Sequence, residues 1–389
     1  MQEYFSPVDS DEISSLLSEL HDSLIHKITF HDHQNGFPSL EGIKLAIVGV
    51  PEYRACVKEV YENVTFNPIR KKLYQLKHHS FESGIADLGN IILGDTPEDT
   101  FFALSAVVNE LVKQNIVPII IGGSHDLTYA QYQGYASLNK IINMAVVDSR
   151  FDLGGPEDNL NSLTFIGKIV LEQPSHLFNL SVIGYQTYFV GQEAVDLMER
   201  MYFDTYRLGT VRSEMNEMEP VIRGADMMSF DMCSIKQSDC PGTTYPSANG
   251  LTGDEACQLM RYAGMNDLLS SVGLFEYYEA EDRNGHTASL IAEMIWYFIE
   301  GFENRKAEMP VGSTSNFITY KVPLEQQERD LVFLKSKKSD RWWMELIHPN
   351  GSKGNERKGY IPCSYKDYHQ ACQNEIPDKW WQTLNKLSE

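Results

Sequence analysis

The sequence predicts an α/β fold of three layers, in which helices cover both faces of a mostly parallel central sheet. Short runs rich in valine, isoleucine and methionine alternate with longer amphipathic stretches, and this alternation is typical of parallel sheets. The short runs lack polar alternation, which indicates strands buried on both faces. The chain has 389 residues, of which 42% are hydrophobic, and can therefore bury the core that such a domain needs.

Six apolar runs are predicted as strands, and two longer stretches as helices. The strands are expected at residues 43–50, 117–121, 141–147, 180–184, 225–230 and 268–275. The first helix is expected over residues 96–115, because Thr96 suits an N-cap, Pro97 suits the first helical position and apolar residues recur at helical spacing. The second helix is expected over residues 287–302.

The chain is predicted to divide into three segments. An N-terminal helical extension (residues 1–41) precedes the α/β domain (42–305), and a C-terminal extension (306–389) follows it. Within the last segment, residues 331–346 predict a hairpin. Ser364 is expected to cap a helix that runs toward Cys372.

The C-terminal extension is rich in tryptophan. It contains Trp342, Trp343, Trp380 and Trp381, four of the five tryptophans of the chain. We favour the interpretation that these aromatic side chains pin the extension onto its own domain. The alternative is a docking surface for a protein partner.

Composition excludes several classes of function. The formal net charge is −21, which disfavours binding to nucleic acid. No apolar segment is long enough to span a membrane, and the acidic, amphipathic start of the chain does not resemble a secretory signal. The six cysteines lack paired spacing, which favours reduced thiols and a cytoplasmic location. The expected partners are a small-molecule substrate or a protein, and a homo-oligomer stays open.

Polar residues follow directly after several of the predicted strands. They are residues 122–126, residues 148–152, residues 231–233 and Glu276. In an open parallel sheet, ligands bind at this carboxyl edge. Three carboxylates and an imidazole that converge there form a site of the type that Mn²⁺ or Mg²⁺ prefers. Alternatively each aspartate caps a helix or turn, an interpretation that is good for one residue and weak for four together.

These blocks resemble the signatures of the ureohydrolase superfamily, which includes arginases, agmatinases and formimidoylglutamases. That family has GGDHS, DAHXD and SXDXDXXDP, and this sequence has GGSHD at 122–126, DSRFD at 148–152 and SFDMC at 229–233. The resemblance spans roughly residues 42–303. It implies an arginase-like fold and a site for two Mn²⁺ ions that hydrolyse a C–N bond.

The resemblance also assigns the metal ligands and shows that the two-metal site is incomplete. One metal of the family takes residues that match His125, Asp148, Asp152 and Asp231, all of which are present. The second metal needs a histidine and an aspartate at positions where this chain has Arg150 and Cys233. A divergent member with one divalent ion, Mn²⁺ above others, or with none, is therefore expected.

Arg150 is expected to replace the missing second metal as a fixed cation. One divalent ion and one guanidinium would balance the three aspartates, so we expect Arg150 to fork onto Asp148 and Asp231. Cys233 is either a thiolate ligand that favours Zn²⁺ or, as we prefer, a buried inert thiol.

Two further acids complete the expected catalytic group, which consists of Arg150, Glu276 and Asp126. Glu276 matches the family glutamate that holds the guanidinium-like group of the substrate. Its alternative is an acid on the surface at a strand end. Asp126 replaces the serine of the family signature and adds another acid, which makes a bound cation more favourable.

Two functions follow from the altered site. The first is a hydrolase for a non-peptide C–N bond of a formimino or guanidino compound, nearest to formimidoylglutamase, that uses one metal and Arg150. Because Arg150 repels a cationic substrate, a neutral or anionic one fits better than arginine, and a standard arginase is disfavoured. The second is a non-catalytic pseudoenzyme that acts as a scaffold or binding protein through its C-terminal extension. A metal-stabilised sensor is a weaker third possibility.

Overall fold

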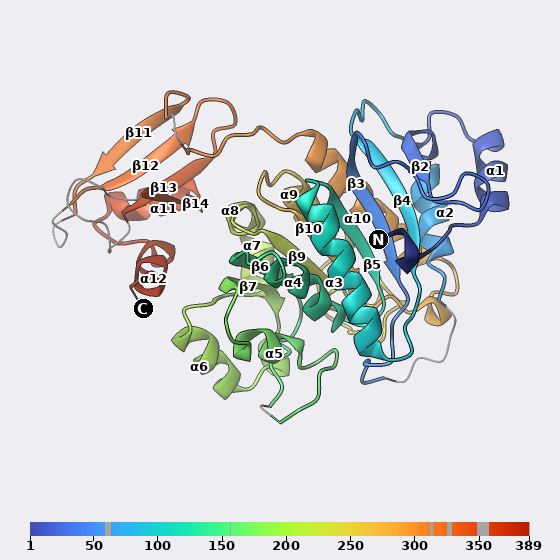
Figure 1. Ribbon diagram of the computed structural model, residues 1–389. Helices are drawn as coiled ribbons and strands as arrows, with labels where there is room; N and C mark the ends of the chain where they lie inside the picture. Colours follow the sequence, from blue (N-terminus) through green and yellow to red (C-terminus); the bar gives the residue numbers. More distant parts are fainter. Residues whose placement is uncertain (59–63, 156, 312–313, 325–328, 348–357, 389) are drawn as a thin grey trace.

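The protein has a large, mostly parallel sheet at its centre (Figure 1). The computed structural model describes residues 1–389 except 59–63, 156, 312–313, 325–328, 348–357 and 389. The sheet has ten strands in the order β1-β4-β3-β5-β10-β9-β6-β7-β8, and β2 also pairs with β4. All of its neighbouring strands are parallel except the β1–β4 pair. The strands are β1 (Phe5–Ser6), β2 (Ile28–Phe30), β3 (Ile43–Val50), β4 (Gly84–Ile91), β5 (Val117–Gly122), β6 (Ile142–Val147), β7 (Leu177–Tyr185), β8 (Asp204–Arg207), β9 (Met227–Asp231) and β10 (Ser271–Phe275).

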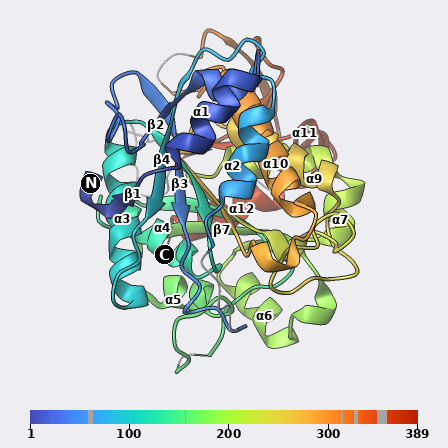
Figure 2. The same ribbon diagram turned by 90° about the vertical axis from the view of Figure 1, so that its right-hand side faces the viewer.

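Helices cover both faces of this sheet, as Figures 1 and 2 show. Their apolar sides pack with the strands into two separate buried cores, one on each face. The helices of one face are α1 (Ser10–Glu19), α2 (Asn67–Gln75), α7 (Leu208–Ser213), α8 (Met218–Arg223), α9 (Gly253–Gly264) and α10 (His286–Glu303). Those of the other face are α3 (Pro97–Lys113), α4 (Leu127–Ala136), α5 (Phe165–Leu171) and α6 (Gln192–Arg200). The predicted three-layer α/β/α class is therefore confirmed.

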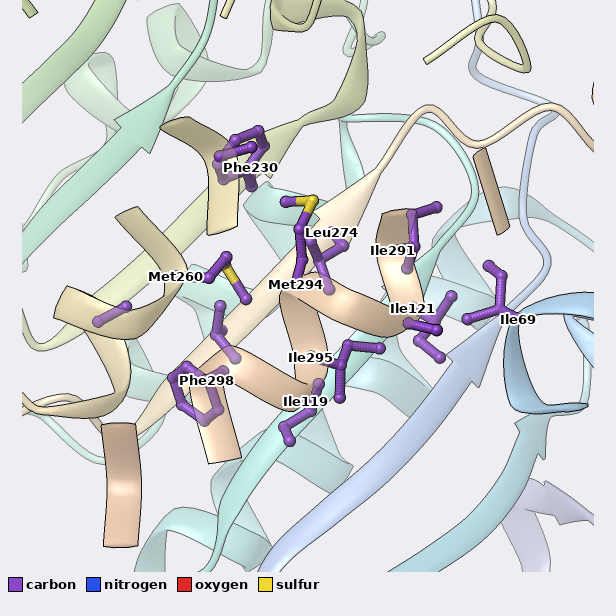
Figure 3. Close-up of a cluster of buried hydrophobic side chains, with 14 of the residues drawn as sticks. Ile69, Ile119, Ile121, Phe230, Met260, Leu274, Ile291, Met294, Ile295 and Phe298 are labelled. Atoms are coloured by element: carbon purple, nitrogen blue, oxygen red, sulfur yellow. The ribbon is translucent and has the colours of Figure 1, made fainter. Parts of the chain in front are cut away.

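The core on the α10 side shows why the central strands lack polar residues (Figure 3). Ile119 and Ile121 of β5 and Leu274 of β10 lie under α10 and are at most 1% exposed. Each such side chain stabilises the fold by about 1.5–3 kcal/mol through its removal from water. The packed strands form a rigid platform, and their carboxyl ends are fixed relative to one another.

Several predicted elements are confirmed, with shifted ends. Helix α3 begins after Thr96, whose hydroxyl accepts a hydrogen bond from the backbone of Asp99 while the Asp99 carboxylate accepts one from the backbone of Thr96. Strand β10 begins at Ser271, later than predicted, because Asn266 accepts the backbone N–H of Leu268 and turns the chain there.

Strand β4 was not predicted, because its sequence GIADLGNI contains polar residues. Two of these polar side chains accept hydrogen bonds from Arg70. The Arg70 Nε donates to the Asp87 Oδ2 at 2.9 Å, and another Arg70 nitrogen donates to the Asn90 Oδ1 at 2.8 Å. A buried charge is stable in a sheet when its partner is buried with it.

The N-terminal extension differs from the prediction of a helical segment. It contains the helix α1 (Ser10–Glu19) and two 3₁₀ turns, but its strands β1 and β2 both pair with β4 and so belong to the central sheet. The chain up to residue 41 therefore completes one edge of the α/β domain. None of the helices in the described part of the chain has the length and apolar composition needed to cross a bilayer.

The C-terminal extension forms a second sheet with its own small core. The predicted hairpin is confirmed, since β12 (Leu331–Ser336) and β13 (Trp342–Ile347) pair antiparallel between β11 (Phe317–Val322) and β14 (Lys358–Cys363). Ser364 caps the helix α11 (Tyr365–Cys372) as predicted. A final helix, α12 (Asp378–Lys386), follows.

Three of the tryptophans contact residues of the α/β domain and so hold the extension to it. Arg223 of α8 stacks 4.4 Å from the ring of Trp343 and donates hydrogen bonds at 3.1 Å to the backbone oxygens of Trp342 and Cys363. Trp381 packs edge-to-face on Tyr202. These contacts agree with the interpretation favoured from the sequence, in which the aromatic side chains pin the extension onto the protein's own domain. The docking of a protein partner stays a prediction.

Candidate metal centre

The predicted site residues follow four strands that are neighbours in the sheet, in the order β5, β10, β9 and β6. His125 comes three residues after β5, Glu276 directly follows β10, Asp231 ends β9, and Asp148 directly follows β6. Because all four strands run parallel, their carboxyl ends meet at one edge of the sheet. The topology therefore brings together residues that are far apart in the sequence.

His125 is held rigidly by its surroundings. A side chain at Gly123 would meet the Glu52 carbonyl oxygen at 1.9 Å, so glycine allows the close approach that turns the chain toward the site. The imidazole packs 4.5 Å from the ring of Phe165, and its Nε2 forms a 2.9 Å hydrogen bond with the Ser229 hydroxyl. The Nδ1 atom is buried and has no hydrogen-bond partner in the described structure.

Two aspartates from the end of β6 face this free nitrogen. The Oδ2 atom of Asp148 lies 3.3 Å from Nδ1 of His125, and the Oδ2 atom of Asp152 lies 3.5 Å from it. The three residues each offer a ligand atom within 4.8 Å of the others. Asp148 Oδ2 and Asp152 Oδ1 are also buried without a hydrogen-bond partner among the described residues. Asp152 has the uncommon backbone angle φ 42°, a type of strain that clusters at functional sites.

Asp231 lies beside this cluster, but it is not one of the three residues whose ligand atoms all fall within 4.8 Å. It lines the same cavity as His125. Its Oδ1 accepts a 2.7 Å hydrogen bond from the backbone N–H of Cys233, which fixes the carboxylate. The structure thus brings three of the four predicted ligands into one group and places the fourth next to it.

Glu276 is 2% exposed, so the alternative of a surface acid is wrong. Its Oε1 accepts the backbone N–H of His125 at 2.7 Å, and its Oε2 accepts the Thr244 hydroxyl. The backbone angle φ of 69° is uncommon for glutamate and indicates strain that the surrounding structure imposes. This carboxylate lines the cavity together with Asp231.

Burial and mutual repulsion disfavour negative charge on these acids. Burial, with the nearby Asp152, raises the pKa of Asp148 to about 7. Burial also raises the pKa of Asp231 to about 7, where Asp148 is the neighbouring charge, and that of Glu276 to about 7, where Asp231 is. Burial lowers the pKa of His125, but Asp148 and Asp152 outweigh this and hold the pKa well above its usual value. The pocket therefore favours a cation among its carboxylates.

The position of Arg150 shows that the hypothesis of a fork onto Asp148 and Asp231 is wrong. Within the described residues its guanidinium forms no ion pair within 4.0 Å, so it does not fork onto Asp148 or Asp231. Instead it stacks 4.2 Å from the ring centre of Phe189, and only its backbone N–H reaches Asp148, at 2.8 Å. The physical reason is that the aromatic face of Phe189, in the loop after β7, attracts the guanidinium away from the strand end. Arg150 still lines the cavity.

Cys233 and Asp126 both lie apart from the three-residue cluster. The Cys233 thiol is buried and bonds to the Thr244 hydroxyl at 3.4 Å, and burial with Asp231 holds its pKa well above the usual range. These contacts fit a buried, protonated Cys233 better than a thiolate that binds a metal. Asp126 is fully buried, bonds to the Ser124 hydroxyl, and is not among the residues that line the cavity. Its position does not support direct contact with a substrate.

The cavity, of about 460 Å³, contains residues that the sequence did not reveal. Ser229 does not line the cavity but contacts the far side of the His125 ring; it belongs to the block at 229–233, and strand alternation, which puts it on the same face as Asp231, is the signal that would have assigned it a role. Ser162, Thr244 and Tyr245 come from irregular loops, and Phe189 ends a 3₁₀ helix of three residues (Thr187–Phe189). They are placed by the fold, and no local pattern predicts them.

The donors of the cluster fit a hard divalent cation. An imidazole nitrogen and carboxylate oxygens suit Mn²⁺, and the buried atoms without partners are the ones that a cation would satisfy. The other imidazole nitrogen bonds to Ser229, and this is the outer contact that usually orients a ligating histidine. His125, Asp148 and Asp152 are therefore the residues suited to hold a metal.

Fold and site together define a class, namely three-layer α/β proteins with a cluster of potential metal ligands at the carboxyl edge of a parallel sheet. Within that class the chain belongs to the arginase family, whose model matches residues 44–300. The ureohydrolase resemblance seen in the sequence is thereby confirmed.

Formimidoylglutamases are among the relatives that the chain resembles. The one from Lysinibacillus sphaericus (strain C3-41) is 24% identical over 227 residues, which cover 55% of this chain and 70% of that protein. The one from Staphylococcus aureus (strain MRSA252) is 23% identical over 270 residues, 67% of this chain and 78% of that protein. The crystal structure of Trypanosoma cruzi formiminoglutamase with Mn²⁺ superposes with a TM-score of 0.63 at 20% identity, covering 69% of this chain and 96% of that one. This structural likeness establishes the fold.

Proposed function

We propose that the protein hydrolyses a non-peptide C–N bond of a formimino or guanidino compound with one divalent cation, Mn²⁺, held by His125, Asp148 and Asp152 with Asp231 beside them. The observation that carries the proposal is the cluster of buried, unpartnered ligand atoms that converge within 4.8 Å. When bound, a divalent cation lowers the pKa of water and so supplies a nucleophile near neutral pH. The similarity to formimidoylglutamases supports the choice of bond.

The chain's own groups would position the substrate. Glu276 presents a buried carboxylate to the cavity and is fixed by the backbone of His125 and by Thr244. Amidine-type groups carry N–H donors that such a carboxylate accepts in a charge-assisted hydrogen bond. A carbon held there would be near two of the proposed ligands, because His125 and Asp231 line the same cavity as Glu276.

The decisive experiment measures metal content and turnover on the same protein. Full-length chain is loaded with Mn²⁺, freed of excess ion and examined by elemental analysis, and it is then assayed for release of formamide, urea or ammonia from formimino and guanidino compounds. We expect about one Mn²⁺ per chain and release of one of these products. Asp148→Asn is the matched control, because it keeps the shape of the side chain and removes a ligand charge; we expect it to lose both signals.

Metal content near one without any product would refute hydrolysis and favour the alternative, a non-catalytic protein that acts as a scaffold or binding protein. Metal content near zero in the native chain would refute the metal centre itself. Release of product by the Asp148→Asn variant at the native rate would show that the activity belongs to another site.

A further inference from the structure

A second cavity lies at the amino edge of the central sheet, opposite the edge that holds the candidate metal centre. Its volume is about 320 Å³, within the range of about 300–1,000 Å³ typical of small-molecule sites. Asn143 and Asn179, near the starts of β6 and β7, line one side, and β14 and α12 of the C-terminal extension line the other. The extension thus completes this cavity, which shares no lining residue with the cavity beside the metal centre.

Asn143 brings a buried hydrogen-bond acceptor without a partner to this cavity. Its Oδ1 atom is buried and receives no hydrogen bond from the described residues. The amide nitrogen of the same side chain donates to the Gly224 carbonyl oxygen at 2.9 Å, and this contact fixes which end of the amide is the oxygen. A buried acceptor without a partner is costly, so the site favours a ligand that supplies a donor.

Lys386 of α12 brings a positive charge to the same cavity. Its amine donates to the Oδ1 atom of Asn179, and the Nδ2 atom of Asn179 donates to the Asp204 carboxylate at 2.8 Å, so both ends of this amide are occupied. Burial lowers the pKa of Lys386 to about 8, although the nearby Asp204 opposes this. A ligand carboxylate beside Lys386 would stabilise the charge that burial disfavours.

The sheet register places these two polar groups close together. Asn143 and Asn179 are paired on neighbouring parallel strands, about 4.8 Å apart, and their side chains project from the same face. A ligand that reaches both Asn143 and Lys386 therefore carries its donor on the carbon next to its carboxylate. A hydroxyl suits this position better than an ammonium group, because it offers one donor to one acceptor and adds no second positive charge beside Lys386.

The rest of the cavity is suited to an aromatic ring. Apolar and aromatic side chains from both parts of the chain line it, among them Phe178, Tyr202, Tyr206, Val221, Leu268 and Tyr360. Contacts between aromatic rings contribute beyond the burial of their area. The ligand therefore combines a polar end of two groups with an aromatic body.

We propose that this cavity is a binding site for aromatic 2-hydroxy carboxylates. The carboxylate contacts Lys386, the hydroxyl donates to the Oδ1 atom of Asn143, and the ring packs among the apolar side chains. The site is separate from the candidate metal centre and does not depend on the proposed hydrolysis. Because Lys386 belongs to the C-terminal extension and Asn143 to the α/β domain, the ligand connects the two parts of the protein.

The test compares four ligands that share a phenyl ring and a two-carbon chain: 3-phenyllactate, L-phenylalanine, 3-phenylpropionate and 2-phenylethylamine. The first has both polar groups, the second has an ammonium in place of the hydroxyl, the third lacks the donor and the fourth lacks the carboxylate. Dissociation constants are measured by calorimetry on the full-length chain. We expect 3-phenyllactate to bind about tenfold more tightly than 3-phenylpropionate, and 2-phenylethylamine to bind weakest.

Variants then assign this order to the two polar residues. Asn143→Ala should weaken 3-phenyllactate to the level of 3-phenylpropionate, whose own affinity should stay unchanged and thereby reports an intact site. Lys386→Gln should weaken both carboxylates by about tenfold or more. Lys113→Gln is the matched control for a change in net charge, because Lys113 lies exposed at the end of α3. That variant should keep the native affinities.

Binding of none of the four ligands would overturn the inference and leave the cavity to water. Tightest binding of L-phenylalanine or 2-phenylethylamine would overturn the proposed class of ligand, as would equal binding of 3-phenyllactate and 3-phenylpropionate. Native affinities in Lys386→Gln would show that the ligands bind elsewhere. If Asn143→Ala loses all binding, Lys386→Gln decides alone, because its change lies on the last helix of the chain.

Discussion

The two halves of the candidate site differ in what their polar atoms contact. On one side, His125 Nδ1, Asp148 Oδ2 and Asp152 Oδ1 are buried without a hydrogen-bond partner among the described residues, and the first two of these atoms face each other at 3.3 Å. On the other side, Arg150 stacks on Phe189, and Cys233 bonds to Thr244. In the first half the ligand-type atoms face one another, whereas in the second half both side chains contact residues outside the cluster.

The family resemblance implies that Arg150 and Cys233 stand at two metal-ligand positions, and the backbone offers a reason why such replacements would leave the neighbouring aspartates in place. The carboxylates of Asp148 and Asp231 are each oriented by the backbone N–H two residues later, at 2.8 and 2.7 Å. Those donors belong to Arg150 and Cys233, but any residue except proline provides the same N–H. The orientation of Asp148 and Asp231 therefore does not depend on which side chains stand at positions 150 and 233.

Removal of metal should have the largest effect. If the retained half binds Mn²⁺, free ion at a thousand times its dissociation constant stabilises the folded chain by about 4 kcal/mol. A chelator should remove that increment, and scanning calorimetry should record a lower unfolding temperature. The Asp148→Asn variant should unfold at the same temperature with and without chelator. An identical shift in that variant would place the metal elsewhere.

Removal of the Ser229 hydroxyl, which bonds to His125, should have the next largest effect. Ser229→Ala removes the hydrogen bond that orients the His125 ring, so we expect Mn²⁺ affinity to fall by about 10–100-fold. Ser271→Ala is a matched control, because Ser271 is equally buried on the adjacent strand and bonds to Gln131 and Tyr135. Equilibrium dialysis of both variants compares them. Equal affinity losses would mean that the effect is only structural.

The sequence predicted the retained half better than the altered half, for a physical reason. Buried strands fix where their carboxyl ends lie, so the convergence of His125, Asp148 and Asp152 follows from the strand pattern and the family signature. The direction taken by Arg150 depends on Phe189, which lies in a loop after β7 with no pattern that relates it to position 150. Charge balance alone predicted that Arg150 bonds to Asp148 and Asp231, because that argument did not include the contact with Phe189.

The fold follows the same rule. Strands made only of apolar residues were predicted close to their observed positions, whereas β4 was missed because Asp87 pairs with the buried Arg70 from another element. Five further strands were not predicted: β1, β2 and β8 have two to four residues and lie at or near the edges of the central sheet, and β11 and β14 are the edge strands of the second sheet. β1 and β2 pair with β4, which is far along the chain, and a local pattern contains little information about such strands.

A smaller change should come from rebuilding the altered half. Arg150→His together with Cys233→Asp restores the two family ligands, and we expect Mn²⁺ content to rise from about one to about two per chain. Each single variant should stay near one, since one restored ligand leaves the second position incomplete. Elemental analysis after removal of excess ion checks this. An unchanged content in the double variant would mean that the rebuilt backbone no longer presents these positions to a shared metal.

The smallest effect is expected from Cys233→Ser. The thiol bonds to Thr244 and its pKa lies well above the usual range, because burial and Asp231 disfavour a thiolate. A serine hydroxyl keeps the contact with Thr244, so Mn²⁺ affinity should change by less than about twofold, and stability should fall by about 1 kcal/mol or less. A Co²⁺-substituted native chain should show no thiolate-to-metal charge-transfer absorption. If that absorption appears and Cys233→Ser removes it, the thiol is a ligand, and Cys233 belongs with the half of the site that binds the metal.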